Sequence, residues 1–279
     1  MQETVFAGLA VLVPALALGA NFECLIEPAQ VVEMRAAVDG MISAVHVQRG
    51  DSVKRGQVVV ELQSAAEREA VESARYRAQM DGQIATARNR IDYASKKLAR
   101  LTDLEQQNFA SVQSRDEADA ERRLAESELQ VAIENRELAK IEYRRAQEQL
   151  ALRTLASPFN GVVLERTLNP GDLAESGSGR KPVLKVAQID PLRVDIVLPA
   201  TLFGQLKPGF KATVVPVVGN GRYAATVKTV DKVIDAASGT FVVRLELPNP
   251  QQLVPGGARC MAELDGIAVP AATRPKLQP

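Results

Sequence analysis

The chain has 279 residues, and its 34 basic and 34 acidic side chains give a formal net charge of zero. This balance, without a basic stretch interleaved with aromatic residues, excludes a nucleic-acid partner. Aromatic residues make up only 4% of the chain and tryptophan is absent. Thin modules and exposed helices are therefore favoured over one thick globular core.

The N-terminal segment is apolar from Val5 to Ala20 and is interrupted by Pro14. It is shorter than the roughly 20 residues of a membrane span and is typical of the apolar region of a signal peptide. Residues 2–4 contain no Lys or Arg, which a standard signal peptide carries before its apolar region. We therefore expect residues 1–20 to be a signal peptide whose true start lies upstream, or a weak membrane anchor.

The two cysteines, Cys24 and Cys260, lie near the two ends of the folded region. In an oxidising compartment they can form a disulfide. The alternative is that each is a separate small buried hydrophobic residue. Acylation of Cys24 is disfavoured, because the preceding residues 21–23 include a bulky and a charged side chain where a lipoprotein has small ones.

Two short segments about a hundred residues apart share one pattern, a Gly turn, a short strand and a Gly-Asp turn. The first runs from Gly40 to Leu62 and the second from Ala156 to Leu173. Each half is too small to bury a core alone, so we expect them to combine into one small β-sandwich. The first half, with an N-terminal strand, occupies residues 21–63, and the second occupies residues 155–190.

Between these halves, residues 64–154 contain no proline, a single glycine and many strong helix formers. Ser64 and Glu67 predict a capping box at the start of this tract. Asn108 can close one helix and Ser111 can cap the next. We predict two antiparallel helices of about 40 residues each, which at ~1.5 Å per residue reach about 60 Å.

Apolar residues in the tract recur at seven-residue spacing, as in a coiled coil. We expect these residues to form the contact between the two helices: Ile84, Ile91, Ala94, Leu98 and Leu101 on the first helix, and Leu124, Val131, Leu138 and Ile141 on the second.

From Pro191 onward, short alternating strands are separated by Gly or Pro turns. Five or six strands with one helical turn near Ala200–Leu206 predict a small β-barrel over residues 191–266. The proline-rich residues 267–279 are expected to be a disordered tail.

The sequence contains no arrangement of residues that predicts catalysis. The single histidine, His46, has no neighbouring cluster of metal ligands, and no phosphate-binding loop or nucleophile motif is present. The half-motifs resemble biotinyl and lipoyl carrier domains, but no lysine stands at the tight hairpin that would carry the cofactor. We therefore expect a protein that is not an enzyme and has no cofactor or bound metal.

In this order, the modules resemble the periplasmic adaptor (membrane fusion protein, HlyD-like) family of tripartite efflux pumps. The resemblance implies an α+β multidomain chain. It has a split lipoyl-like β-sandwich with an inserted long antiparallel α-helical coiled-coil hairpin, followed by a small β-barrel. In the barrel region it rests on residues 191–194, 206–209, 235–244 and 247–256. The larger family members continue into a membrane-proximal domain, for which this sequence leaves little room after Leu264.

The resemblance also implies partners and a docking site. Arg100, Leu104 and Ser111 have the spacing of the residues with which family members dock onto an outer-membrane channel. The implied function is a periplasmic subunit, associated with the inner membrane through its partners or its N-terminal segment. It would self-associate into a ring, a trimer or a hexamer, and link an inner-membrane transporter to the channel. A resistance-nodulation-division transporter is favoured, with an ATP-driven exporter or type I secretion system, or a non-transport envelope scaffold, as alternatives.

Overall fold

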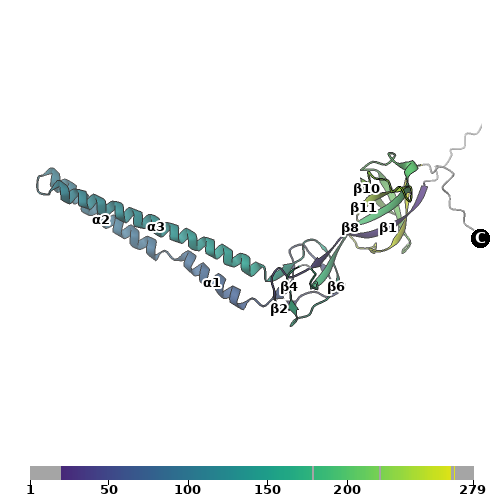
Figure 1. The fold of residues 1–279 in the computed structure, drawn as a ribbon, viewed down its shortest axis with the longest axis horizontal. Coiled ribbons are helices and arrows are strands. Elements are labelled where there is room, and N and C mark those ends of the chain that lie inside the picture. The colour runs from purple at the N-terminus through teal and green to yellow at the C-terminus, as the bar shows by residue number, and fades with distance from the viewer. Residues whose placement is uncertain (1–19, 178, 220, 265–266, 268–279) are drawn as a thin grey trace, which may run out of the picture.

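The computed structural model describes residues 20–177, 179–219, 221–264 and 267. Three parts follow one another along its length: a helical hairpin, a small β-sandwich and a β-barrel (Figure 1). Apart from residues 20 and 267, the expected signal or anchor segment and the expected tail lie outside the described residues. Within the described ranges, none of the helices is both long and apolar enough to span a bilayer.

The sandwich is assembled from strands on both sides of the helical tract. Its four-stranded sheet has the order β5-β4-β2-β7, and β3 pairs with β6 alongside it. Each of the pairs β4–β5, β2–β7 and β3–β6 joins a strand before the helices to one after them. The strand bounds are β2 Gly40–Val45, β3 Ser52–Val53, β4 Val58–Leu62, β5 Thr154–Ala156, β6 Gly161–Arg166 and β7 Leu173–Ala174. Buried Val59, Leu62, Leu155 and Val163 share one core, so neither half is complete without the other.

The hairpin projects from the sandwich, and its second arm is one continuous helix, α3 (Val112–Ala151). The first arm consists of two helices, α1 (Ala65–Gln79) and α2 (Gly82–Gln106), with a break at residues 80–81. The predicted hairpin and its turn are confirmed, but the prediction of a single helix in the first arm is wrong. Met80 has extended backbone angles, and Asp81 beside it pairs with Arg136 of α3 at 2.9 Å.

The predicted capping box at the start of α1 is also wrong. Ser64 stands at the N-cap, but its side chain makes no capping hydrogen bond. Glu67 instead pairs with Arg153 at 2.6 Å. This ion pair connects the first turn of α1 to the segment that follows α3, and so fixes the base of the hairpin.

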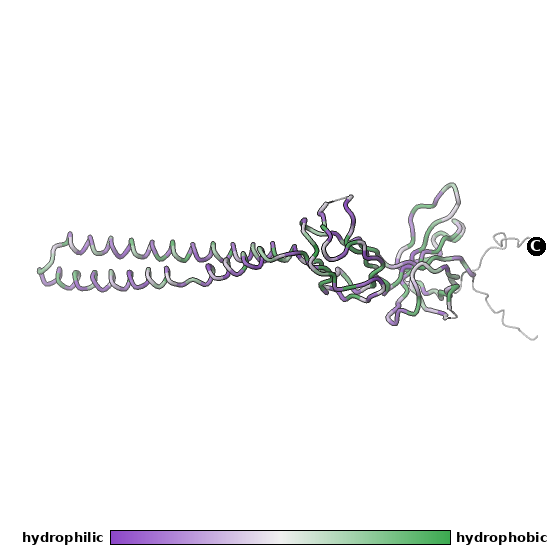
Figure 2. Tube along the Cα trace, turned by 90° about the horizontal axis from the view of Figure 1, so that it is seen from below, coloured by the Kyte–Doolittle hydropathy of each residue, from purple (hydrophilic) through white to green (hydrophobic). Residues whose placement is uncertain are grey.

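The helices meet through small residues. In α3 the buried positions are Ala118, Ala125, Ala132 and Ala146. Opposite them on α2, Ile84, Ala87 and Ala94 are buried, as the sequence predicts for Ile84 and Ala94. The prediction for α3 is wrong, because the predicted contact residues face solvent with exposures of 61% for Leu124, 54% for Val131, 55% for Leu138 and 53% for Ile141. Apolar and polar residues accordingly alternate around both arms (Figure 2).

The barrel is a closed ring of six strands in the order β1-β12-β9-β10-β11-β8, with β8 pairing back to β1. Its helical turn, η1 (Ala200–Leu202), buries Leu202 in the barrel core. The predicted small barrel of five or six strands and its helical turn are confirmed, but one of the six strands, β1, comes from outside the predicted range of residues 191–266. The strands are β1 Ala20–Met34, β8 Leu184–Pro199, β9 Lys211–Pro216, β10 Tyr223–Val230, β11 Thr240–Leu247 and β12 Arg259–Leu264.

Two long strands, β1 and β8, belong to both the barrel and the sandwich. Their antiparallel pairing runs from Cys24↔Ile196 in the barrel to Met34↔Leu184 in the sandwich, with a register shift between Pro28 and Gln30. The shift lies where one module ends and the other begins. The barrel and the sandwich are therefore joined by a two-stranded ribbon (Figure 1).

Candidate docking site at the hairpin tip

The turn at the outer end of the hairpin is closed by backbone hydrogen bonds. Asn108 has a φ of 62°, in the left-handed region that asparagine tolerates better than most residues. The Phe109 N–H donates to the carbonyl oxygen of Leu104 at 2.8 Å, and the Asn108 N–H donates to Glu105 at 2.9 Å. These bonds satisfy carbonyls at the end of α2, so Asn108 closes the helix as the sequence predicts.

Ser111 begins the second arm. Its backbone is extended, and its Oγ accepts a hydrogen bond from the Ser114 N–H at 3.1 Å. This is the bond of a helix N-cap, so the predicted capping role of Ser111 is confirmed. Its predicted docking role stays a prediction.

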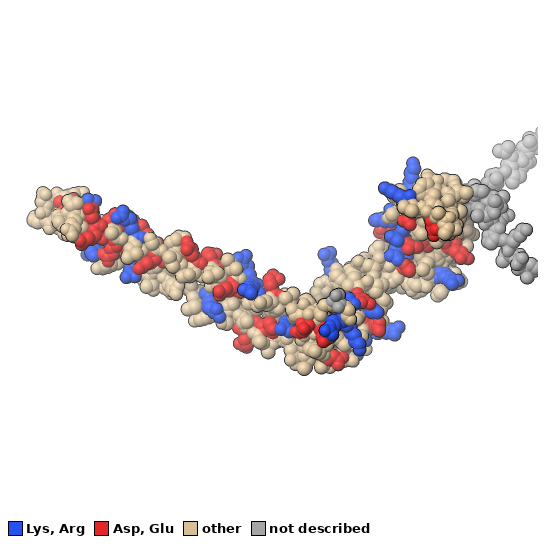
Figure 3. All heavy atoms as spheres, in the orientation of Figure 1, with Lys and Arg blue, Asp and Glu red and all other residues tan. Residues whose placement is uncertain are grey.

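The surface of the tip is apolar. Leu104 is 40% exposed, Phe109 79% and Val112 55%. In Figure 3 the outermost end of the hairpin is mostly uncharged, whereas acidic and basic side chains alternate along the arms. Phe109 is a further candidate contact residue that was not predicted from the sequence. The signal for it is an aromatic ring in a helix-breaking turn, in a chain where aromatic residues make up only 4%.

Arg100 lies two turns below the end of α2 and is exposed. It makes no ion pair with any residue that the structure describes, whereas nearby Arg115 contacts Glu105 at 3.5 Å and Asp116 at 3.2 Å. Arg100 therefore keeps its guanidinium available for a carboxylate or carbonyl of another molecule. Arg100 therefore places a positive charge about two helical turns from the apolar residues of the tip.

Ion pairs join the two arms below the tip. Lys97 pairs with Glu121 at 2.7 Å, and Arg90 with Glu128 at 2.8 Å. The hydrogen bond to the Glu121 carboxylate, followed by its negative charge, raises the pKa of Lys97 above its usual value. These exposed pairs contribute little free energy individually, but they fix the register of α2 against α3.

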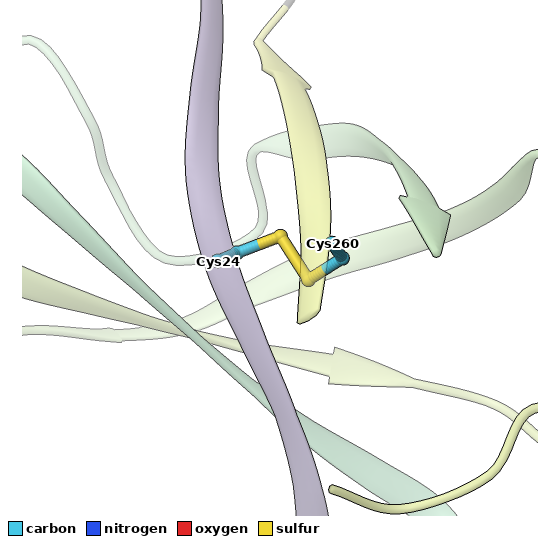
Figure 4. The surroundings of a disulfide bond; sticks show 2 residues. All are labelled: Cys24 and Cys260. Atoms are coloured by element: carbon cyan, nitrogen blue, oxygen red, sulfur yellow. A yellow bond between two sulfur atoms is a disulfide. The ribbon is translucent and has the colours of Figure 1, made fainter. Parts of the chain in front are cut away.

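Cys24 and Cys260 lie opposite one another on the paired strands β1 and β12. A disulfide joins these two neighbouring strands of the barrel (Figure 4), and the two Cα atoms are 4.9 Å apart. Both residues are buried. The disulfide is far from the hairpin tip, so its contribution is to the barrel and not to the docking site.

The described part of the structure shows no cluster of metal-binding side chains. No group of three or more His, Cys, Asp or Glu side chains there is placed to hold a metal ion. His46, the only histidine, lies 3.0 Å from the Glu61 carboxylate through Nε2.

Comparisons with known proteins agree with this architecture. A family model described as a CzcB-like barrel-sandwich hybrid domain matches residues 30–187. The multidrug resistance protein MdtA of Escherichia coli O139:H28 (strain E24377A / ETEC) is 28% identical over 262 residues, covering 88% of this chain and 59% of MdtA. The chain thus spans less than two thirds of that relative.

Two solved structures share the fold. The crystal structure of MacA from Actinobacillus actinomycetemcomitans has a TM-score of 0.71 and 23% identity, covering 88% of this chain and 79% of MacA. The membrane fusion protein Spr0693 from Streptococcus pneumoniae R6 has a TM-score of 0.59 and 17% identity, covering 89% of this chain and 100% of Spr0693.

Proposed function

The chain belongs to the family with a CzcB-like barrel-sandwich hybrid domain, and from this premise we propose that it is a periplasmic adaptor subunit of a tripartite efflux pump. The hairpin reaches an outer-membrane channel, and the barrel end faces an inner-membrane transporter. A ring of copies, a trimer or a hexamer, forms the conduit between them. The role is mechanical and needs no catalytic residue.

One observation carries this proposal: the hairpin tip and the β-barrel lie at opposite ends of the described part of the molecule (Figure 1). Ala20 pairs with Leu264 at the far end of the barrel. The 40 residues of α3 extend about 60 Å from the sandwich at helical rise. An elongated molecule with a contact surface at one end is suited to connect two partners that lie far apart.

We further infer that the sandwich is a lipoyl-like domain split by the hairpin. The cross-pairing of its halves supports this inference, since every sandwich strand before the helices pairs with one after them. No cofactor is assigned to it, because the hairpin occupies the place where a carrier domain presents its modified lysine.

The inner-membrane partner that we favour is a resistance-nodulation-division transporter. The name of the relative MdtA, a multidrug resistance protein, supports drug efflux as the process. An adaptor of an ATP-driven exporter or type I secretion system is the alternative. Efflux that stops when an uncoupler collapses the proton gradient while ATP is maintained supports the first, and efflux that continues supports the second.

The docking role of Arg100, Leu104 and Ser111 is tested by placing charge on the tip. Leu104→Glu puts a carboxylate on an apolar surface that must lose water when it meets the channel. At equal protein level, we expect drug tolerance and cross-linking to the channel to fall to the levels of cells without the protein. Gln149→Glu adds the same charge at the exposed base of α3 and should change neither.

Unchanged tolerance and cross-linking in Leu104→Glu would overturn the docking assignment. A non-transport scaffold predicts a further result, in which deleting the whole protein leaves drug tolerance unaffected. Arg100→Ala separates the roles of the cation and the apolar residues. It should weaken cross-linking while leaving the hairpin folded, because Arg100 has no ion-pair partner within the described residues.

A further inference from the structure

A polar cleft of about 420 Å³ lies between the sandwich and the barrel. Its sandwich wall includes Lys54 and Asn160, and its barrel wall includes Asp190 and Gln252. Among the lining residues that the structure describes, Lys54 is the only cation and Asp190 the only anion. Two opposite charges therefore line one cleft, on walls that belong to different modules.

The turn that carries Lys54 is fixed to the sandwich. The Lys54 N–H donates to Oε1 of Gln57 at 2.9 Å, and the N–H of the next residue, Arg55, donates to Oδ1 of Asn160 at 2.8 Å. The Lys54 side chain itself is exposed and makes no ion pair within the described ranges. Its ammonium group is therefore available to a partner across the cleft, on a turn that moves with the sandwich.

Asp190 is fixed to the barrel. Its Oδ1 accepts a hydrogen bond from the backbone N–H of Asn249 at 2.8 Å. Asn249 is only 4% exposed, and its side chain donates to the carbonyl oxygens of Ile189 and Val254, both at 3.0 Å. Asp190 therefore moves with this loop of the barrel. It makes no ion pair with any residue that the structure describes, which leaves its Oδ2 for another donor.

The cleft lies beside the interruption in the ribbon of β1 and β8. The regular pairing of β1 with β8 stops at Pro28 and resumes at Gln30. Asp190 lies between their partners on β8, Leu192 and Gln188. A bend at the interruption changes the width of the cleft, because the two walls belong to the modules on either side of it.

We infer that Lys54 and Asp190 form an ion pair when the ribbon bends toward the cleft. This pair, the latch, holds the sandwich and its hairpin in one orientation relative to the barrel. Narrowing the cleft removes water from between the two charges, and their attraction is stronger at the lower local dielectric. Salt weakens it by screening. The latch is a property of the single chain and goes beyond the proposed adaptor function.

Chemical capture of the narrowed cleft tests the latch in the purified full chain. Ser52→Cys and Pro250→Cys place one thiol on each wall, while the native cysteines are tied in a disulfide. A short bis-maleimide joins the two new thiols when the cleft is narrow. The rate of joining is divided by the rate at which a monofunctional maleimide modifies the same thiols, which corrects for their reactivity.

In this parent protein, Lys54→Gln should lower the corrected rate about two- to fivefold, as expected for the loss of one partly exposed ion pair. Arg55→Gln is the matched control. It removes the same charge from the neighbouring position of the turn, outside the cleft lining, and should leave the rate unchanged. Salt at about 1 M should slow joining in the parent and not in Lys54→Gln.

Asp190→Asn removes the charge but keeps an oxygen that can accept the Asn249 N–H. It should lower the rate as Lys54→Gln does, and the two substitutions combined should lower it no further. Effects that multiply in the double variant would show that each charge acts separately and would overturn the latch. A rate that neither substitution changes, or no joining in the parent, overturns it as well. None of these outcomes bears on the adaptor function, which the tip substitutions test.

Discussion

Asp39 connects segments that are far apart in the sequence through both its carboxylate and its backbone carbonyl. Its Oδ1 accepts hydrogen bonds from both the backbone N–H and the hydroxyl of Ser176, and its carbonyl accepts one from Arg153 at 2.9 Å. The hydrogen bond from the Ser176 backbone N–H, and then that from its hydroxyl, lower the pKa of Asp39 below its usual value of 3.8. One residue thus holds the loop after β7 and the base of the hairpin.

This network predicts a pH dependence. Because the pKa of Asp39 is lower in the folded chain, its stabilising effect is complete above pH 3.8 and is lost as the pH falls through the lowered pKa. The protection of the Ser176 amide, measured as its exchange rate relative to the intrinsic rate at the same pH, should therefore fall only in that acidic range. Asp39→Asn should lower this protection at neutral pH as well, and an amide equally protected in both proteins would contradict this role.

The capping role of Ser111 can be separated from its predicted docking role. Ser111→Ala removes the cap of α3 and should cost about 1 kcal/mol of helix stability. Hydrogen exchange in the first turn of α3 measures this cost. Ser111→Asp keeps a capping oxygen and should preserve the turn. If the aspartate variant folds normally and loses cross-linking to the channel, docking requires the serine itself or its neutrality. If both variants dock normally, Ser111 is a cap alone.

At the scale of elements, α3 carries two stripes with the same seven-residue spacing. One consists of alanines and is buried, and the other is the Leu124, Val131 and Leu138 stripe, which is exposed. A seven-residue period establishes the spacing of a coiled coil but does not say which stripe meets the partner helix. Size decides here, because small residues let the two arms approach closely. Hydrophobicity alone favours the Leu124, Val131 and Leu138 stripe, which is why the predicted contact of α3 is wrong.

The break between α1 and α2 had only a weak local signal in the sequence, Gly82, the single glycine of the tract, which stands directly after the break. Met80 and Asp81 are not helix breakers as strong as proline, and the Asp81–Arg136 ion pair that accompanies the break joins residues far apart in the chain. Local propensity cannot detect such a contact. By contrast, Asn108 and Ser111 act through bonds to residues within five positions, and both were predictable.

Two glycines of different elements should respond oppositely to alanine. A Cβ on Gly82 would meet nothing within 4 Å, whereas one on Gly161 would lie 2.3 Å from the carbonyl oxygen of Ala187. Gly82→Ala should stabilise α2 by up to about 1 kcal/mol. Gly161→Ala should disrupt the pairing of β6 with β8 and destabilise the sandwich. Urea unfolding of both variants measures the difference, and a loss of stability in Gly82→Ala would contradict the first expectation.

At the scale of the whole molecule, the order of the modules was predictable because each has its own sequence pattern: alternating strands, a helix-rich tract without proline, and strands separated by turns. The way in which the modules are joined was not predictable. Nothing in the sequence of residues 20–34 or 184–199 distinguishes two separate short strands from one long strand. Their continuity depends on pairing between β1 and β8, which are about 160 residues apart in the chain.

The disulfide connects the first and last strands of the barrel. Cys24→Ala with Cys260→Ala should lower the free energy of unfolding of the barrel by about 2–5 kcal/mol. Hydrogen exchange at β11 reports on this module, and the hairpin should be unaffected. Wild-type protein treated with a reductant should match the variant. Equal barrel stability in the oxidised wild type and the variant would show that the bond contributes nothing.

The ribbon of β1 and β8 also determines how the molecule carries load. Hydrogen bonds between antiparallel strands lie perpendicular to the strands, so a pull along the long axis loads the bonds of the ribbon together in shear. Bending meets less resistance, because the paired strands are interrupted by the register shift between Pro28 and Gln30. The joint is therefore stiff in tension and compliant in bending, so the hairpin can swing relative to the barrel without separating from it.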